Sequence, residues 1–174
     1  MSNIGDEILS KVSGGKDLIS KIASKIPGFS GYINREERRK SDKLLRDTIS
    51  ARFAEQVRRV SELQQEFISG GEIMYVDDLE KSALKLRTFA DRIKTASRGY
   101  SSLFEAVKIN EEELDKILAY DNALLEMSDE VGRAIDHVQA SIGTDGIQAS
   151  IRNLAQAAQK CIDAYNRRDD VVLA

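Results

Sequence analysis

Apolar residues recur every three or four positions along most of this chain, which is the spacing of one buried face of an α-helix. Four long stretches follow this pattern: residues 35–68, 77–108, 111–142 and 147–165. In the second stretch the repeat tightens to a heptad, whose repeating position holds Leu79, Leu86, Ile93, Tyr100 and Val107. The spacing predicts four long helices, each of which buries one face.

The residues between these stretches are typical of helix ends. Asn34 followed by Glu37 has the spacing of an N-terminal cap, and Asn110 opens the third helix in the same way. The glycine pair at 70–71 ends the first long helix, and the glycine-containing segment 143–146 separates the last two. The helices are therefore joined by short connections.

Composition supports the same fold class. The 174 residues include a single proline, and 32% of them are charged, as long solvated helices require. Because short connections favour antiparallel neighbours, we predict an all-α protein, an antiparallel four-helix bundle of long helices that forms one domain over residues 34–174. A separate N-terminal amphipathic helix and a Pro/Gly linker, residues 1–33, precede it. The bundle is then expected to stay folded, with modestly lower stability, when residues 1–27 are deleted.

The N-terminal segment differs in chemistry from the bundle. Its apolar residues fall within roughly a third of a helical wheel. They are Ile4, Ile8, Val12, Leu18, Ile19, Ile22 and Ile26. The linker then holds Phe29 and Tyr32, and a basic cluster follows, made of Arg35, Arg38, Arg39, Lys40, Lys43 and Arg46. Such a helix is expected to dock on something, and the linker aromatics either anchor it against the bundle or insert into a partner or a lipid headgroup layer.

The charge is divided unevenly along the chain. Residues 1–46 hold ten Lys/Arg and six Asp/Glu, for +4, whereas residues 47–174 hold sixteen and twenty-three, for −7. This split indicates either an anionic partner for the basic end or packing between the two ends of the chain. Nucleic acid is disfavoured as a partner by the net charge of −3 and by the lack of aromatic residues within the basic stretch.

An apolar helix beside a basic cluster is a two-signal arrangement for reversible membrane binding. No stretch reaches the roughly 18 consecutive apolar residues that would span a bilayer. In its layout of an N-terminal amphipathic helix, a proline and long charged helices, the chain resembles bacterial membrane-stress scaffolds of the phage-shock type. That resemblance implies binding to anionic membranes and polymerisation. The arms of the first hairpin are shorter here than in such scaffolds, which argues against polymerisation.

Candidate catalytic groups are few. Cys161 is the only cysteine and His137 the only histidine, so the chain can form no internal disulfide and no common soft-ligand metal site by itself. We expect no cofactor, with His137 at the surface and Cys161 in the core. Asp121, Ser128 and Ser82 fall on inward stripes, which indicates either polar groups that specify the helix register or a buried ligand site. The sequence does not predict an enzyme.

Three classes of function remain. The leading prediction is a non-catalytic helical scaffold or adaptor that docks on an anionic membrane surface or a protein partner through residues 4–46. It would be cytoplasmic, either free or peripheral on the inner face of a membrane. The alternative is a self-contained bundle, as a homo-oligomer or structural subunit, with the first helix packed on the bundle and any function carried by the acidic face. The third class, a small-ligand or enzyme bundle that uses Asp121, Ser128 or His137, is least favoured.

Overall fold

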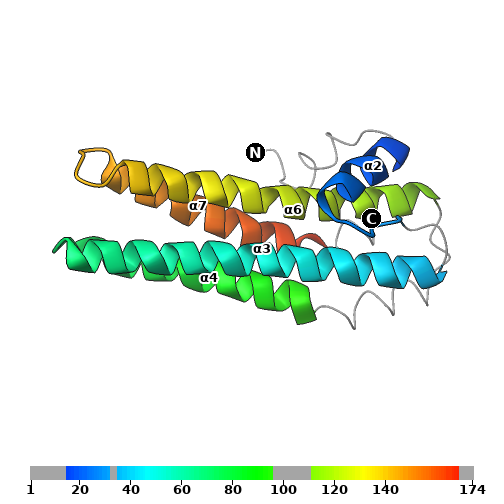
Figure 1. The fold of residues 1–174 in the computed structure, drawn as a ribbon, viewed down its shortest axis with the longest axis horizontal. Helices are drawn as coiled ribbons and strands as arrows, with labels where there is room; N and C mark the ends of the chain where they lie inside the picture. Colours follow the sequence, from blue (N-terminus) through cyan, green and yellow to red (C-terminus); the bar gives the residue numbers. More distant parts are fainter. Residues whose placement is uncertain (1–14, 32–34, 96–110, 169–174) are drawn as a thin grey trace.

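The computed structural model describes residues 15–31, 35–95 and 111–168 (Figure 1). Within these ranges the chain is helical apart from short turns and contains no strand, which confirms the predicted all-α class. The elements are α2 (Gly15–Lys25), α3 (Arg35–Ser69), the short 3₁₀ helix η1 (Ile73–Tyr75), α4 (Val76–Thr95), α6 (Glu111–Ala140) and α7 (Ile147–Asn166). The helix predicted over 96–108 and the caps at Asn34 and Asn110 lie outside the described residues.

Helices α3 and α4 form an antiparallel hairpin. Phe53 of α3 packs on Phe89 of α4 with ring centroids 4.4 Å apart, and nearer the turn Phe67 meets Tyr75 edge-on at 5.7 Å. Gly71 reverses the chain with φ 80°, a conformation that L side chains rarely adopt. The glycine pair therefore ends α3 where the sequence predicted.

Helices α6 and α7 form a second antiparallel hairpin. The Tyr120 hydroxyl donates to the carbonyl of Ala164 at the open end, while the hydroxyls of Ser141 and Ser150 lie 2.7 Å apart beside the turn. Gly143 has φ 74° in that turn. Both interhelical turns lie at the same end of the molecule (Figure 1).

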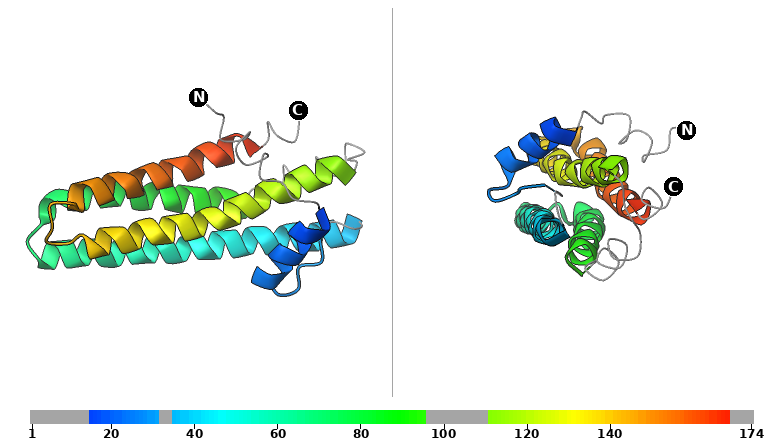
Figure 2. Two further views of the ribbon diagram at one scale, coloured as in Figure 1. Left: turned by 90° about the horizontal axis from the view of Figure 1, so that it is seen from above. Right: turned by 90° about the vertical axis from the view of Figure 1, so that its right-hand side faces the viewer.

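The two hairpins pack side by side, with α3 next to α6 and α4 next to α7 (Figure 2). Arg52 and Arg59 of α3 pair in the same order with Asp129 and Asp136 of α6, so these two helices run parallel. The expectation that consecutive helices are neighbours was wrong for α4 and α6, which lie across the bundle from each other. The short turns determine each hairpin, but not how one hairpin lies on the other.

The core follows the apolar stripes that the sequence showed. The heptad residues Leu79, Leu86 and Ile93 of α4 are buried, and so is Phe89, which packs on Tyr165 of α7 with ring centroids 6.2 Å apart. Contacts of this kind join α3, α4 and α7 into one apolar interior. None of the described helices is long and apolar enough to cross a bilayer.

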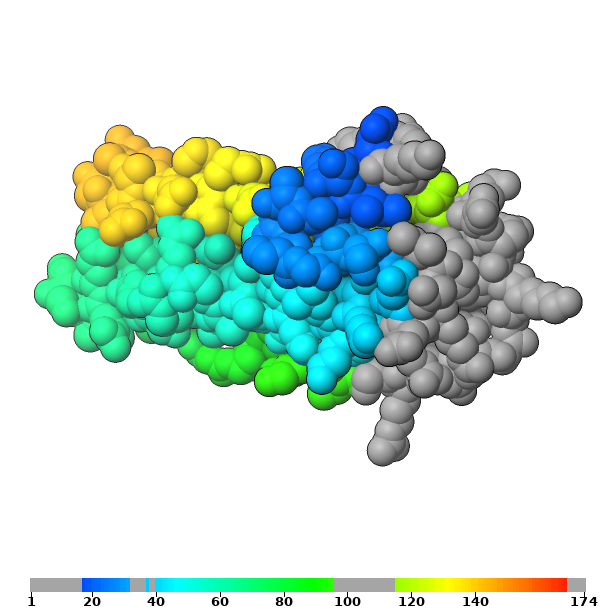
Figure 3. Space-filling model, turned by 45° about the vertical axis from the view of Figure 1, so that its right-hand side comes forward, coloured from blue at the N-terminus to red at the C-terminus, as the bar shows by residue number. Residues whose placement is uncertain are grey.

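The N-terminal helix α2 lies on the outside of this arrangement, against α6. Figure 3 shows α2 and the segment after it covering the surface where α3 and α6 meet. The predicted binding residues of α2 therefore lie at the junction of α3 and α6.

Candidate functional site

The apolar face of α2 is buried against the bundle. Leu18, Ile22 and Ile26 recur every four residues, and their side chains are 5%, 0% and 2% exposed. Phe29, one turn beyond the helix, is 5% exposed and belongs to the same apolar core. Fully burying one such side chain contributes about 1.5–3 kcal/mol, so this face holds α2 in place mainly through the hydrophobic effect.

Two glycines let the chain leave α2 and turn toward α3. Gly28 has φ 87° and Gly31 has φ 82°, both in the left-handed region. A Cβ at Gly31 would lie 2.9 Å from Cδ1 of Ile19, so the backbone here packs directly on the side chain of α2. The Ser30 and Ser41 hydroxyls, 3.5 Å apart, connect this segment to α3.

Two lysines on the outer side of α2 converge on Glu126 of α6. The distances from Nζ to Oε1 are 2.7 Å for Lys21 and 3.6 Å for Lys25, and Asn122 donates to the same oxygen at 3.2 Å. Burial favours a higher pKa for Glu126, but the hydrogen bonds from Lys21 and Asn122 and the lysine charges outweigh it and lower the pKa. The Lys21 side chain is 53% exposed, so each ion pair contributes at most about 1 kcal/mol and is weakened by salt.

The structure separates the predicted binding residues into three groups. Leu18, Ile22, Ile26 and Phe29 are in the core, with Ile19 partly buried beside them. The side chains of Lys40 and Lys43 are exposed on α3. The remaining predicted residues lie outside the described backbone or side chains: Ile4, Ile8, Val12, Tyr32, Arg35, Arg38 and Arg39. Among the described side chains, those of the α2 apolar face therefore point inward, whereas Lys40 and Lys43 of α3 point outward.

One member of the predicted basic cluster is not a surface residue. Arg46 is only 9% exposed and binds Asp42 one turn earlier, with both Nε and Nη2 2.9 Å from Oδ2. Although Arg46 belongs to the basic cluster of the sequence, its charge is used inside the protein. The spacing of four residues between Asp42 and Arg46 was visible in the sequence, but it does not distinguish a buried pair from an exposed one.

A second buried ion pair lies beside the first. Arg168, just after α7, holds Asp121 of α6 with both ends of its guanidinium, Nε to Oδ1 at 2.9 Å and Nη2 to Oδ2 at 3.1 Å. These two side chains are 4% and 3% exposed. This pair docks the segment after α7 on α6 as far as Arg168.

The two pairs form one balanced cluster of two carboxylates and two guanidiniums, which we call the ionic cluster: Asp42, Arg46, Asp121 and Arg168. Burial raises the pKa of Asp42, and the charges of Arg46 and Arg168 oppose this shift only in part. The Oδ1 atom of Asp42 is buried and accepts no hydrogen bond within the described structure. The ionic cluster joins α3, α6 and the end of α7, and removal of either guanidinium takes away an ion-pair partner of a buried carboxylate.

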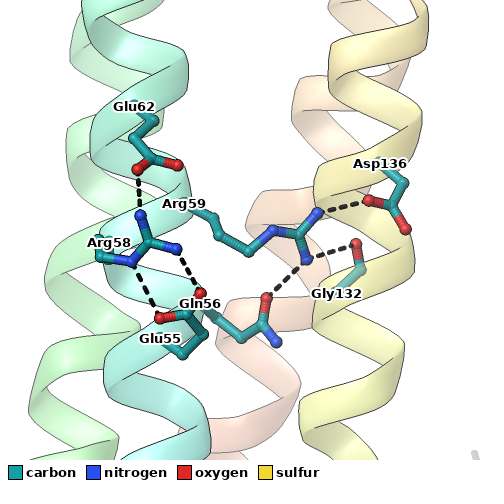
Figure 4. Close-up of polar contacts among 7 residues, drawn as sticks. All are labelled: Glu55, Gln56, Arg58, Arg59, Glu62, Gly132 and Asp136. Atoms are coloured by element: carbon teal, nitrogen blue, oxygen red, sulfur yellow. Dashed lines mark hydrogen bonds and ion pairs between the residues drawn. The ribbon is translucent and has the colours of Figure 1, made fainter.

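A separate polar seam joins α3 to α6 (Figure 4). The Arg59 guanidinium bonds Asp136 and the Gln56 side chain, and its Nη1 lies 3.5 Å from the carbonyl oxygen of Gly132. A Cβ at Gly132 would come within 3.4 Å of both the Arg59 and Gln56 side chains, so glycine leaves them room. Arg58, by contrast, points outward and pairs with acids of its own helix.

The side chains considered for catalysis or ligand binding face solvent, are buried in the core or bond to other groups of the protein. His137 is exposed, and burial raises the pKa of the Cys161 thiol to about 12. The hydroxyls of Ser82 and Ser128 donate to carbonyls of their own helices, at 3.0 and 2.7 Å. Asp121 is inside the bundle, as its stripe predicted, and its partner is Arg168. Among the described residues, no group of three or more His, Cys, Asp or Glu could hold a metal ion.

No family model matches the chain, and no curated protein or solved structure is significantly similar to it. The function must therefore be inferred from the α2 junction, the ionic cluster and the exposed surface.

Proposed function

We propose that this protein is a non-catalytic binding scaffold built as a self-contained helical bundle, with its N-terminal helix packed on the bundle. The finer architecture in this proposal is a bundle of four long helices, built from two antiparallel hairpins packed side by side, with α2 as an added helix. The observation that carries the proposal is the burial of the α2 apolar face, in which Ile22 is 0% exposed. A face that completes the protein's own core is not free to bind a partner.

The charge distribution supports a role in binding for the rest of the surface. The chain after residue 46 has a formal charge of −7 and presents its acids mainly on helix exteriors, where they keep the bundle soluble and attract cationic partners. A protein partner or self-association is therefore part of the proposal. A cytoplasmic location is part of it as well, because the single cysteine is buried as a free thiol.

A second function is favoured by the exposed lysines around α2. Lys21, Lys40 and Lys43 all face solvent, and among the described residues partly exposed ion pairs hold the outer edge of α2. If α2 left the bundle, its apolar face and these lysines would together suit an anionic membrane surface, where each basic residue adds about 1 kcal/mol. The protein would then be an adaptor that docks through residues 4–46.

Vesicle co-sedimentation distinguishes the two functions. We expect the wild-type chain to stay in the supernatant with phosphatidylcholine vesicles that contain phosphatidylglycerol, even at low salt, because α2 remains on the bundle. The variant Glu126→Lys removes the acid that holds both lysines and replaces it with a repelling charge, so it measures how readily α2 is released. The variant Glu130→Lys is the matched control, since Glu130 lies one turn further along α6 and pairs with Lys160 of α7 instead.

Sedimentation of the wild-type protein with the anionic vesicles, reversed by salt and by Ile22→Glu, would replace the first function by the second. Sedimentation of Glu126→Lys alone, with Glu130→Lys and wild type in the supernatant, would show that the docked state is the resting one and that Glu126 maintains it.

A further inference from the structure

The turn between α3 and α4 exposes large apolar side chains. Ile68, Ile73 and Met74 are 55%, 69% and 75% exposed, and they are three of the four most exposed large hydrophobic residues in the described structure. They lie within one short stretch of chain at the end of the molecule away from α2 (Figure 1). Contiguous exposed apolar groups of this kind mark interaction sites more often than single ones do.

The turn holds these side chains in place. Phe67 is buried and packs on Tyr75, so the residues before and after the turn are anchored in the core. Backbone amides at the end of α3 are satisfied as well: Gly70 donates to Glu66 at 2.9 Å and Glu72 to Phe67 at 2.9 Å. An apolar surface that is already ordered loses little conformational entropy when a partner covers it.

Acidic residues surround this apolar tip. Residues 62–81 contain six Asp/Glu and one Lys, for a formal charge of −5. Lys81 already pairs with Asp77 and Asp78, and within the described structure Glu66 and Glu72 have no cationic partner. Asp77 and Asp78 also open α4, where the positive end of the helix dipole stabilises them. Among the described residues, the turn segment thus combines exposed apolar side chains with an excess of negative charge, of which Glu62 alone pairs with an arginine, Arg58.

From this combination we infer that the α3–α4 tip is a docking surface for a basic amphipathic segment of a partner protein, whose apolar side chains cover Ile68, Ile73 and Met74 while its Lys and Arg residues meet the carboxylates. Charge complementarity selects this occupant. An anionic membrane is repelled by these carboxylates. A second copy carries basic stretches around α2 and over residues 85–95, but the large apolar side chains beside them, such as Ile22 and Phe89, are buried. The inference deepens the proposed scaffold function and rests on it.

The probe is a fluorescein-labelled synthetic peptide of Leu and Lys in helical amphipathic order, and the measurement is fluorescence anisotropy with the full chain. The double variant Ile73→Ser with Met74→Ser removes apolar surface and keeps the charge. The double variant Glu66→Gln with Glu72→Gln removes two negative charges and keeps the apolar surface. We expect each to weaken binding about tenfold or more, the first because two largely exposed side chains no longer become buried. Circular dichroism should be unchanged, since the altered side chains lie outside the core.

Matched controls test whether the location matters. Leu84→Ser removes from α4 an apolar residue that is 55% exposed, as Ile68 is, and Asp91→Asn with Asp163→Asn neutralises two exposed acids far from the turn. These variants should bind the peptide within about twofold of wild type. A peptide of the same composition in scrambled order should bind more weakly to wild type, because its apolar groups no longer share a face.

The inference is overturned if wild type does not bind the ordered peptide, if the scrambled peptide binds equally well, or if the tip variants bind like the controls. It is also overturned if sedimentation shows a dimer that Ile73→Ser with Met74→Ser converts to monomer, because the occupant is then a second copy. None of these results bears on whether α2 is packed on the bundle, which vesicle co-sedimentation tests separately.

Discussion

The ionic cluster makes a sharp prediction for Arg168. In the variant Arg168→Met the side chain keeps much of its apolar bulk but loses the guanidinium that binds Asp121 and lowers the pKa of Asp42. Two buried carboxylates then remain with Arg46 as the one cation of the cluster. Breaking a buried ion pair by removal of one partner costs about 3–5 kcal/mol, and we expect a loss of unfolding free energy in that range at about pH 7.

The expected cost depends on pH, and the sign follows from the raised pKa of Asp42. A carboxyl whose folded-state pKa lies above its unfolded value binds more protons in the folded protein, so folding stability falls as pH rises through the interval between the two values. Loss of Arg168 removes a charge that lowers the pKa of Asp42, so this pKa rises further. The destabilisation by Arg168→Met should therefore shrink as the pH is lowered from about 7 toward the range in which Asp42 takes up its proton.

Urea denaturation followed by circular dichroism measures this prediction. Arg167→Met is the matched control, because Arg167 is the exposed neighbour of Arg168, and it should change stability by less than about 0.5 kcal/mol. Asp121→Asn combined with Arg168→Met leaves the neutral pair of Asp42 and Arg46 and should recover most of the loss. If Arg168→Met costs no more than Arg167→Met, or if the double variant is as unstable as the single one, the cluster does not contribute as described.

Other parts of the structure make further predictions. Phe89→Ala and Leu124→Ala change fully buried positions, so each should lower the free energy of unfolding by about 2–5 kcal/mol in denaturation experiments. His137→Ala changes an exposed position and should lower it by almost nothing. The reverse order would contradict the assigned core. Gly31→Ala should lower the free energy of unfolding by about 1–3 kcal/mol and speed proteolysis near α2, because the new Cβ would lie 2.9 Å from the Ile19 side chain and the φ of residue 31 is 82°. An unchanged cleavage rate would argue against this close packing. Cys161, with its pKa raised to about 12, should react with a thiol reagent only in denaturant, and rapid labelling of the native protein would show that α7 opens.

The sequence predicted the helices well because burial of one face leaves a repeat that can be read locally. The predicted stretch 35–68 is α3, Arg35–Ser69, and the stretch 111–142 is α6, Glu111–Ala140. The buried polar residues Asp121 and Ser128 could also be recognised, since they interrupt an apolar stripe. Each of these inferences needed only residues that are near one another in the chain.

What the sequence could not provide are relations between distant segments. An amphipathic face shows that α2 must be covered, but the same face would serve its own bundle, a partner or a lipid surface equally well. The side-by-side placement of α3 and α6 depends on pairs such as Arg59 with Asp136, which have no local signature. The burial of Arg46 has no local signature either, since the type of a residue does not reveal which way its side chain points.

The burial of α2 also changes one expectation. From the apolar stripes alone, deletion of residues 1–27 should lower stability only modestly. Leu18, Ile22 and Ile26 are now seen in the core, so the deletion also uncovers apolar surface on α6 that they pack against. We expect a folded but clearly destabilised protein, with a thermal midpoint several degrees lower, measured by circular dichroism.

Native-state hydrogen exchange of the wild-type chain, read by mass spectrometry over residues 18–26, tests most directly whether the N-terminal helix belongs to the bundle. An α-helix of this length is marginal on its own, so its amides are protected only while its apolar face is packed. We predict slow exchange there, with the protection lost in Ile22→Asp and retained when anionic vesicles are added to wild type. Exchange at the rate of an unfolded peptide in the wild-type protein would contradict the self-contained bundle and return α2 to the role of a free docking helix.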